Sequence, residues 1–226
     1  MAAKLVPMLL VLAAAGALAA QTLPADTLAP IAILAGQTAR NQDGTVNVVV
    51  ECPAGTIVKS EVYPDGVLRV QPDTLGIGWK GMSVIDFLAY PANYGMIPGT
   101  LMARQAGGDG EPLDVMVLGG AIERGSVVRA RLIGAIALLD GAEQDDKLLA
   151  VIDDSPLGDV HDVSDLDERY AGLTATLESW LTSYKGVGKI TSYGYVGTRA
   201  AERLLDAAVS SYLAQAAPAV DTAGGQ

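Results

Sequence analysis

The sequence predicts an α+β domain built around a small antiparallel β-barrel. Half of the 226 residues are apolar, which is enough to bury a core and excludes disorder of the whole chain. Short β-branched runs bounded by turn residues fill the middle of the chain. Toward the C-terminus the apolar residues instead recur every three or four positions, as in amphipathic helices. Strands that precede helices are typical of this fold class.

The first residues are typical of a secretory signal peptide. Lys4 precedes an apolar run, Leu5 to Ala20, that is shorter than the roughly 20 residues needed to span a bilayer. Ala17-Leu18-Ala19 then supplies a small-x-small cleavage site. We therefore expect residues 1–19 to be removed, no stable membrane span, and export to the periplasm or the medium of a bacterium. The alternatives are an uncleaved anchor or a buried N-terminal helix, and without a signal peptide the protein would be cytoplasmic.

Residues 20–44 are expected to form a linker or a loosely docked N-terminal arm. Pro24 and Pro30 interrupt them, and they have no clear hydrophobic period. The folded domain is expected at residues 45–214. Residues 215–226 end in Ala-Gly-Gly-Gln and predict a flexible tail.

The first strand is predicted at residues 45–51, a β-branched run between Asp43-Gly44 and Pro53. Pro64-Asp65-Gly66 then predicts the turn of a hairpin. The two arms of that hairpin and the remaining strands are predicted at residues 58–63, 67–70, 113–118, 126–139 and 147–152. Gly134 marks the point where the long strand is expected to bend.

Two helices follow the strands. Apolar residues recur at offsets of three and four from Leu166 to Tyr184, which predicts one amphipathic helix. Ser164 followed by Asp167 is expected to cap its start, and Lys185-Gly186 is expected to end it. A second helix is predicted at residues 198–213.

The charge of the chain limits the kind of ligand. With 26 acidic and 15 basic residues the net charge is -11, which argues against binding to a nucleic-acid backbone. An OB-type nucleic-acid-binding domain would also need stacking aromatics, and the chain has a single Phe. The acidic surplus suits a protein that collects cations. Cys52 is the only cysteine, which excludes an intramolecular disulfide and a multi-cysteine metal site.

Two loops concentrate the carboxylates. Three lie between Asp109 and Asp114, on a turn that enters a strand, and four more lie between Asp140 and Asp146. Crowded carboxylates are either solvated or neutralised by a hard cation, and both interpretations stay open for each loop. Neither loop has the ligand pattern of an EF-hand. Mg²⁺ binds a few carboxylates together with waters and substrate phosphate, which suits two loops that converge on one site.

A phosphate substrate would also need cationic and phenolic partners. The candidates are Lys59 and Glu61 on one face of a strand, the turn phenols Tyr90 and Tyr94, Lys147 after the second acidic loop, and Tyr184-Lys185 at the helix end. Three of them have a simpler explanation as well. Tyr184 suits the apolar core, Lys185 favours a helix C-terminus, and Lys59 suits a solvated strand face.

Several motifs follow one another in a distinctive order. They are Tyr-Pro-Ala-Asn-Tyr-Gly-Met-Ile-Pro-Gly-Thr-Leu at 90–101, Asp-Gly-Glu-Pro-Leu-Asp-Val at 109–115, Gly-Ser-Val-Val-Arg-Ala-Arg-Leu-Ile-Gly at 125–134, Asp140 followed by Asp145-Asp146-Lys147, and Tyr184-Lys185. Together they resemble the soluble family I inorganic pyrophosphatases (inorganic diphosphatases). The resemblance covers roughly Val46 to Tyr212, and it depends on the order of the motifs because each alone is weak.

The resemblance implies a fold and an activity. The fold is a five-stranded OB-like barrel with flanking C-terminal helices. The activity is hydrolysis of pyrophosphate to two orthophosphates by a metal-activated water, with several Mg²⁺ ions per site and Mn²⁺ or Zn²⁺ as substitutes. It also implies pyrophosphate bound as a metal complex, and a homo-oligomer, the hexamer of many bacterial members. Metal-complexed substrate explains how an acidic chain binds a polyanion.

The resemblance also assigns roles to individual residues. The carboxylates implied to hold the metal pair that activates water are Asp109, Asp114 and Asp145. Asp140 is implied to bind a substrate-associated metal, and Glu51 to line the same site. The groups implied to hold phosphate oxygens are Lys59, Tyr94, Lys147, Tyr184 and Lys185, and those implied to support them are Glu61 and Tyr90.

Three departures from the family pattern bear on activity. Glu111 stands where the family has the Asp that assists deprotonation of the attacking water; we expect it to keep that role, although its extra methylene moves the carboxylate by about 1 Å. The family's Arg before the Tyr-Pro motif is absent; Lys80 is the nearest cation, and Arg69 and Arg104 are further candidates. Gly141 replaces an acidic residue. The second hypothesis is therefore a catalytically impaired homologue that binds metal-phosphate without efficient turnover.

Overall fold

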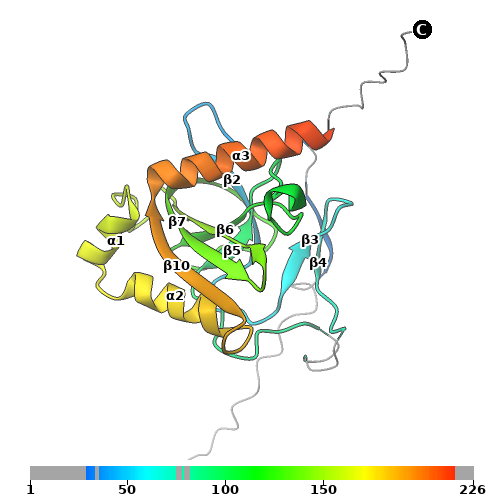
Figure 1. The fold of residues 1–226 in the computed structure, drawn as a ribbon, viewed down its shortest axis with the longest axis horizontal. Helices are drawn as coiled ribbons and strands as arrows, with labels where there is room; N and C mark the ends of the chain where they lie inside the picture. The colour runs from blue at the N-terminus through cyan, green and yellow to red at the C-terminus, as the bar shows by residue number, and fades with distance from the viewer. Residues whose placement is uncertain (1–28, 34–35, 75–77, 79–81, 217–226) are drawn as a thin grey trace, which may run out of the picture.

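The computed structural model describes residues 29–33, 36–74, 78 and 82–216 (Figure 1). The predicted signal peptide, the first part of the linker, the tail beyond residue 216 and Lys80 lie outside these residues. Within the described part of the chain, no helix combines the length and the apolarity needed to cross a membrane.

The main sheet brings together strands from the whole domain. Its central members are β2 (Val46–Cys52), β5 (Asn93–Met96), β6 (Asp114–Leu118), β7 (Val127–Asp140) and β9 (Lys147–Val151). The long strand β7 pairs with both β2 and β9, so the pairings β7-β2-β5-β6-β9-β7 return to the strand where they began. Two further strands, β8 (Glu143–Gln144) and β10 (Ile190–Gly197), also pair with β7.

One pairing differs from the predicted arrangement. β6 runs parallel to β9, with Val115 opposite Leu148. The long strand β7 lies between them in sequence and carries the chain back across the molecule, so β9 enters the sheet in the direction of β6. The sheet is mixed, and the expectation of an entirely antiparallel barrel is wrong at this pair.

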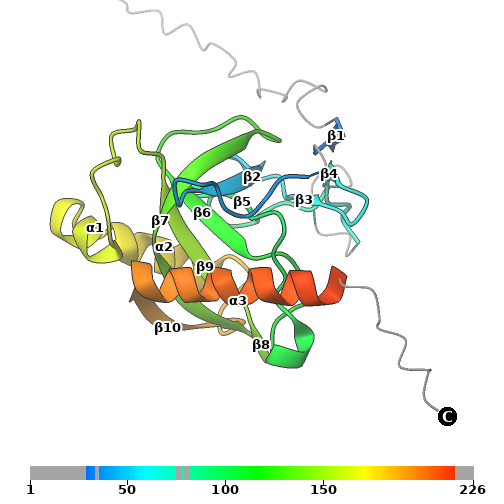
Figure 2. The same cartoon turned by 90° about the horizontal axis from the view of Figure 1, so that it is seen from above.

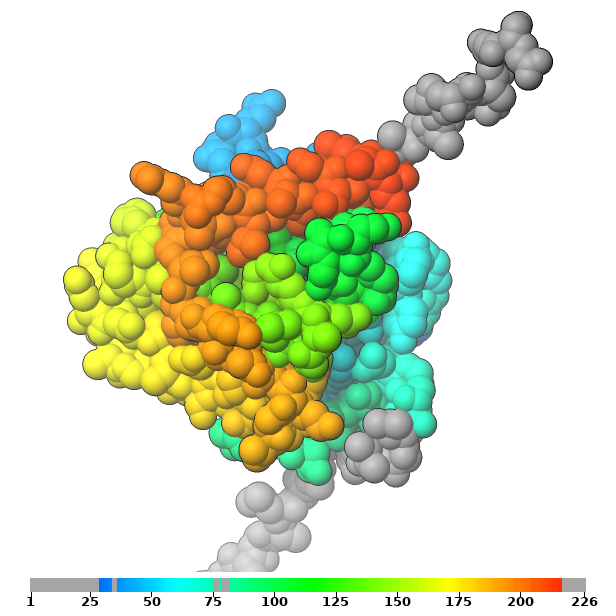
Figure 3. All heavy atoms as spheres, viewed as in Figure 1, coloured from blue at the N-terminus to red at the C-terminus, as the bar shows by residue number. Residues whose placement is uncertain are grey.

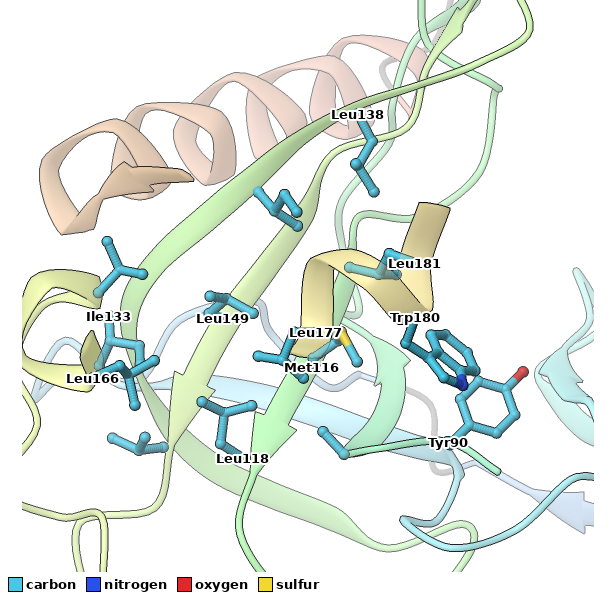
Figure 4. Packing of buried hydrophobic residues seen from close by; sticks show 14 of the residues in the cluster. Tyr90, Met116, Leu118, Ile133, Leu138, Leu149, Leu166, Leu177, Trp180 and Leu181 are labelled. Carbon is cyan, nitrogen blue, oxygen red and sulfur yellow. The ribbon is translucent and has the colours of Figure 1, made fainter. Parts of the chain in front are cut away.

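Helices cover two clusters of buried side chains. α3 (Thr198–Ala216) lies across one side of the sheet and buries Ala201, Leu205 and Ala208 (Figure 1). The apolar side of α2 (Leu173–Ser183) packs on the other cluster, where Figure 4 shows Leu177, Trp180 and Leu181 facing the sheet. These apolar contacts hold the strands whose ends carry the polar residues of the candidate site.

A second, smaller sheet stands beside the main one (Figures 1 and 2). β3 (Ser60–Val62) and β4 (Val67–Val70) form the predicted hairpin. β1 (Ile31–Ala32) adds antiparallel to β4, with Ile31 opposite Leu68. The N-terminal arm expected from the sequence is therefore docked in the part that the structure describes.

The predicted helix from Leu166 to Tyr184 is wrong as a single element. The segment forms α1 (Val163–Arg169) and α2, which are separated where Gly172 adopts a φ of 86°. The apolar period continues across this break, so periodicity alone could not reveal it. The predicted cap is also displaced: Asp162, with Asp165, forms the capping box of α1 instead of Ser164 with Asp167.

The remaining predicted elements are confirmed, with ends displaced by at most three residues. The expected bend at Gly134 is confirmed as a register shift between β7 and β9. β5 and β10 were not predicted. β5 has no β-branched residue, and its Gly95 runs so close to β2 that a Cβ would lie 1.9 Å from the Val49 carbonyl oxygen. A register shift near Gly194 interrupts β10.

Candidate active site

One cavity of about 220 Å³ brings the predicted site residues together. Those that line it are Glu51, Lys59, Glu61, Tyr90, Tyr94, Asp109, Glu111, Asp114, Asp140, Asp145, Lys147, Tyr184 and Lys185. On the face in Figure 3, the cyan hairpin β3–β4 lies opposite the lime-green end of β7 and the acidic loop that follows it. The residues meet because the sheet places the starts of β6 and β9 side by side. Lys80 is the one predicted site residue that lies outside the described chain.

Lys147 lies at the centre of the polar contacts. Its buried Nζ donates a hydrogen bond to Asp114 Oδ2 at 2.5 Å and another to Asp145. The Tyr94 hydroxyl donates to the same Asp114 oxygen at 2.5 Å. Burial lowers the pKa of the Lys147 ammonium, but the two carboxylates outweigh burial and hold that pKa above its ordinary value. The four side chains therefore form one hydrogen-bonded group in which the Lys147 ammonium stays positively charged.

Glu51 is a buried carboxyl group in the wall of the cavity. The residue is only 4% exposed, and its Oε1 accepts a hydrogen bond from the Val62 amide at 2.7 Å. Burial and the neighbouring Asp114 raise the pKa of Glu51 to about 8. In the metal-free chain at neutral pH this group is mostly protonated, so a cation that binds there must displace a proton.

The first acidic loop lies at the rim. Asp109 Oδ1 accepts a hydrogen bond from the Glu111 amide at 2.8 Å, which holds the loop in a tight turn. The Glu111 side chain is exposed to solvent at this rim. Partial burial and the carboxylates of Glu61 and Asp109 nevertheless raise its pKa.

The second acidic loop adds a carboxylate that the sequence-based assignment missed. Glu143 on β8 lies opposite Asp140 on β7, so both side chains emerge on one face of the hairpin and both line the cavity. Lys185 forms an ion pair with Asp140, and Arg104 forms one with Glu143 at 3.2 Å. The sequence signal for Glu143 was present, because it belongs to the same acidic run.

Two candidates to replace the absent family Arg, Arg69 and Arg104, differ in their contacts. Arg69 forms two hydrogen bonds with Asp65, at 2.8 and 2.5 Å, and its guanidinium lies 5.4 Å from the centre of the Tyr63 ring. It does not line the cavity. Arg104 reaches the rim through its ion pair with Glu143.

An aromatic stack forms the wall beneath α2. Trp180 lies parallel to Tyr184, with ring centroids 4.6 Å apart, and contacts Tyr90 at 5.1 Å. Its indole N–H donates to the Leu88 carbonyl at 2.9 Å, which ties α2 to the segment before the Tyr-Pro motif. Tyr94 lies 5.6 Å from Tyr90. Trp180 does not itself line the cavity, and it packs on Tyr184 from one helical turn earlier in the chain.

Two further polar residues hold the site from behind. The side chain of Asn93 is completely buried and makes four hydrogen bonds: it donates to the carbonyls of Val117 and Gly120, and accepts from the amides of Ala54 and Ile122. Arg124 is also buried and donates to Ser60 Oγ. Single-sequence reasoning offered no signal for Arg124, because its partners are distant in the chain.

The donor set fits a hard divalent cation in its chemistry. Eight carboxylates and three lysines line the cavity, and burial together with mutual repulsion raises the pKa of Glu51, Glu111 and Asp145. Among the described residues, no three acidic, His or Cys side chains converge closely enough to form a complete metal cage. The ammonium of Lys147 instead bridges Asp114 and Asp145. A cation here would complete its coordination with substrate oxygens and water.

The fold and the cavity define an α+β domain whose site combines donors for oxyanions with carboxylates for hard cations. A family model described as "Inorganic pyrophosphatase" matches residues 48–213. The chain therefore belongs to the inorganic pyrophosphatase family.

Individual relatives agree with this assignment. An inorganic pyrophosphatase of Gluconobacter oxydans is 42% identical over 132 residues, which are 54% of this chain and 65% of that protein. One of Corynebacterium efficiens is 30% identical over 174 residues, 75% of this chain and 99% of that protein. The solved structure of the Helicobacter pylori inorganic pyrophosphatase is 29% identical, with a TM-score of 0.62 over 78% of this chain and 96% of that chain.

Proposed function

We propose that this chain is an inorganic diphosphatase, which hydrolyses inorganic pyrophosphate to two orthophosphates with a metal-activated water. One observation carries the proposal: three lysines and three tyrosines, which suit phosphate oxygens, share a single cavity with eight carboxylates, which suit hard cations. Pyrophosphate that enters with Mg²⁺ satisfies both sets of groups at once. The matching relatives are named inorganic pyrophosphatases, which supports the same activity.

The residues that would hold Mg²⁺ are Asp109, Asp114 and Asp145, with Asp140 and Glu51 beside them. When bound, Mg²⁺ lowers the pKa of a coordinated water and offsets charge on the leaving phosphate, and Mn²⁺ or Zn²⁺ would serve as substitutes. Loading the site requires Glu51 to lose its proton, so tight binding is expected to release protons near neutral pH.

The chain's own cations and phenols hold the phosphate oxygens. Lys147 donates from the buried end of the cavity, and its position between Asp114 and Asp145 fixes its direction. Lys59 and Lys185 provide further positive charge at the walls. Burial raises the pKa of the Tyr94 and Tyr184 hydroxyls, so both remain proton donors throughout the neutral range. These donors stabilise charge as the bridging P–O bond breaks.

Glu111 accepts the proton of the attacking water. Its raised pKa makes it a stronger base than an ordinary glutamate, and its exposed position lets it pass the proton to solvent. Glu111→Gln is expected to lower kcat by about 10²-fold or more, while Glu111→Asp retains turnover. If Glu111→Asp raises turnover sharply and Glu111→Gln leaves it unchanged, this role is wrong.

Release of orthophosphate from pyrophosphate, measured with Mg²⁺ and again with EDTA, tests the function directly. Turnover that depends on Mg²⁺ is expected. Binding of pyrophosphate without release of orthophosphate would overturn the proposal and favour a catalytically impaired homologue.

We also propose three properties that accompany this function. The closed circuit of strand pairs corresponds to the OB-like barrel of the family, the protein assembles as a homo-oligomer of the hexameric kind, and residues 1–19 direct its export. Light scattering of the purified protein tests the assembly. N-terminal sequencing of the protein recovered from the periplasm or the medium tests removal of residues 1–19.

A further inference from the structure

The small sheet β1-β4-β3 forms one wall of the cavity. Lys59, Ser60, Glu61 and Val62, on and beside β3, line the cavity, as does Gln71 just after β4. Within the described residues, no ladder of backbone hydrogen bonds joins β3 to the main sheet. The position of this wall relative to the main sheet therefore depends on side-chain contacts, while backbone hydrogen bonds join Lys59 and Gln71 to Ser83.

Three side chains attach the wall to the main sheet. Glu51 Oε1 accepts from the Val62 amide at 2.7 Å. Cys52 Sγ contacts both the Ser60 amide, at 3.3 Å, and the Ser60 carbonyl oxygen, at 3.4 Å. The third side chain is Arg124, whose Nε donates to Ser60 Oγ at 2.9 Å. These contacts act on Ser60 and Val62, the first and last residues of β3.

Arg124 also connects this wall to the N-terminal arm. It is 8% exposed, and among the described residues no carboxylate lies within ion-pair distance of it. Instead its Nη2 donates to the Leu68 carbonyl of β4 at 3.4 Å, and its Nη1 donates to the Ala29 carbonyl of the arm at 2.8 Å. One guanidinium therefore bonds to β3, β4 and the arm together.

The arm itself is bound along the free edge of β4. The Ile33 amide donates to the Gly66 carbonyl at 2.9 Å, in the turn of the β3–β4 hairpin. Ile31 packs over Gly125, where an added Cβ would lie 2.8 Å from Ile31 Cδ1. The arm thus covers Gly125, the residue next to Arg124. In Figure 2, β1 lies beside β4 on the outer side of the small sheet. These residues precede the family match, which begins at residue 48.

We propose that Arg124 and the arm residues 29–33 position the phosphate-binding wall of the site, with Arg124 acting through Ser60 on the neighbouring Lys59 and Glu61. This inference rests on the proposed function. Among the described residues, no carboxylate lies in ion-pair range of the Lys59 ammonium, so its location follows the backbone next to β3 that carries it. A displacement of about 1 Å in such a group can cost on the order of 10²-fold in rate.

Two variants of the full chain test the proposal, each with a matched control. Arg124→Met removes the three donors. Its control is Arg131→Met, because Arg131 also donates to backbone carbonyls of a distant loop, at Val160 and Gly158, but does not line the cavity. Ile33→Pro removes the amide that bonds to Gly66, and Ile33→Ala is its control. The measurements are kcat and KM for magnesium pyrophosphate, the Kd of magnesium imidodiphosphate by calorimetry, and the melting temperature.

Arg124→Met and Ile33→Pro are both expected to raise KM and the Kd of imidodiphosphate by roughly tenfold, because they displace groups that bind phosphate. Arg124→Lys is expected to recover part of that loss. Arg131→Met and Ile33→Ala are expected to keep KM and Kd within about twofold even where the melting temperature falls.

A fall in melting temperature with unchanged KM and Kd in both test variants would overturn the proposal, because the arm and Arg124 would then be purely structural. If Arg124→Met does not fold, Ile33→Pro decides the question alone. Absence of turnover in the wild-type chain would refute the proposed function but not this inference, which the Kd of imidodiphosphate still tests.

Discussion

Replacing Lys147 by Met removes the positive charge between two carboxylates. The Lys147 Nζ contacts Asp114 Oδ2 at 2.5 Å and also contacts Asp145, and the residue is 2% exposed. Met retains most of the apolar stem, so the loss is chiefly electrostatic. Removing one partner of a buried ion pair costs about 3–5 kcal/mol, because the remaining charge is left without compensation. We expect the metal-free variant to lose about 3 kcal/mol of unfolding free energy at pH 8.

The loss should depend on pH with a definite sign. Without Lys147, the charge of Asp114 acts on Asp145 without compensation, so protonation of the folded state is favoured and the pKa of Asp145 rises further. A folded state that holds extra protons becomes less stable as pH rises, so the variant should approach the wild type near pH 5 and fall behind it toward pH 8. Mg²⁺ should restore part of the difference at pH 8 by supplying positive charge.

Urea unfolding in EDTA at pH 5 and pH 8, followed by tryptophan fluorescence, measures these free energies. Lys189→Met is the matched control, because Lys189 is exposed and does not line the cavity. The variant should also lose phosphate release by about 10²-fold, since a donor to the phosphate is gone. A loss of unfolding free energy below about 1 kcal/mol at pH 8, or an equal loss at both pH values, would show that Lys147 does not stabilise the fold by balancing these carboxylates.

Three further predictions concern stability. Asn93→Ala should cost about 3–5 kcal/mol in urea unfolding, because two amides and two carbonyls lose their partner. Thr182→Ala, which removes a partly buried hydrogen bond, should cost under about 1 kcal/mol, and similar losses in the two variants would contradict this. Burial raises the pKa of Asp162, but hydrogen bonds from Thr198 and Ser164 outweigh burial and hold that pKa below 3.8. Asp162→Asn should therefore lose about 1 kcal/mol of unfolding free energy at neutral pH, and its difference from wild type should vanish in acid. A difference that does not depend on pH would exclude this origin. Glu51 has a pKa raised from 4.5 to about 8, so the metal-free wild type should lose up to about 5 kcal/mol of stability as pH rises through that window. Glu51→Gln should flatten this dependence of stability on pH, measured by thermal unfolding with EDTA. Parallel pH profiles of the two proteins would show that Glu51 does not titrate there.

Much of the candidate site could be predicted because its residues lie in short, ordered motifs. Asp114 and Lys147 each begin a strand, and each follows an acidic loop. Residues at strand starts keep their direction whatever the details of the sheet, so local sequence was sufficient to select them. The two phenols in the Tyr-Pro motif were selected because the motif was expected to form a turn that holds them close together, although it contains a strand, β5, that local propensity did not reveal.

Other residues were not selected because their roles come from register or from distant contacts. Glu143 reaches the cavity only because the β7–β8 pairing sets it opposite Asp140. Arg124 acquires its role from contacts with Ser60 and Ala29, which lie far from it in the chain. The break before α2 arises at Gly172, where the backbone turns while the apolar period continues unchanged.

The amino-acid sequence was sufficient to predict the fold class, most strands, the family resemblance and the chemical types of the site residues. Each of these follows from local composition, period and motif order, which need no knowledge of partners distant in the chain. The parallel pair β6–β9, the raised pKa of Glu51 and the attachment of the N-terminal arm to the wall of the cavity could be recognised only in the folded structure. These depend on which groups become neighbours and how much water remains between them, and those quantities exist only once the chain has folded.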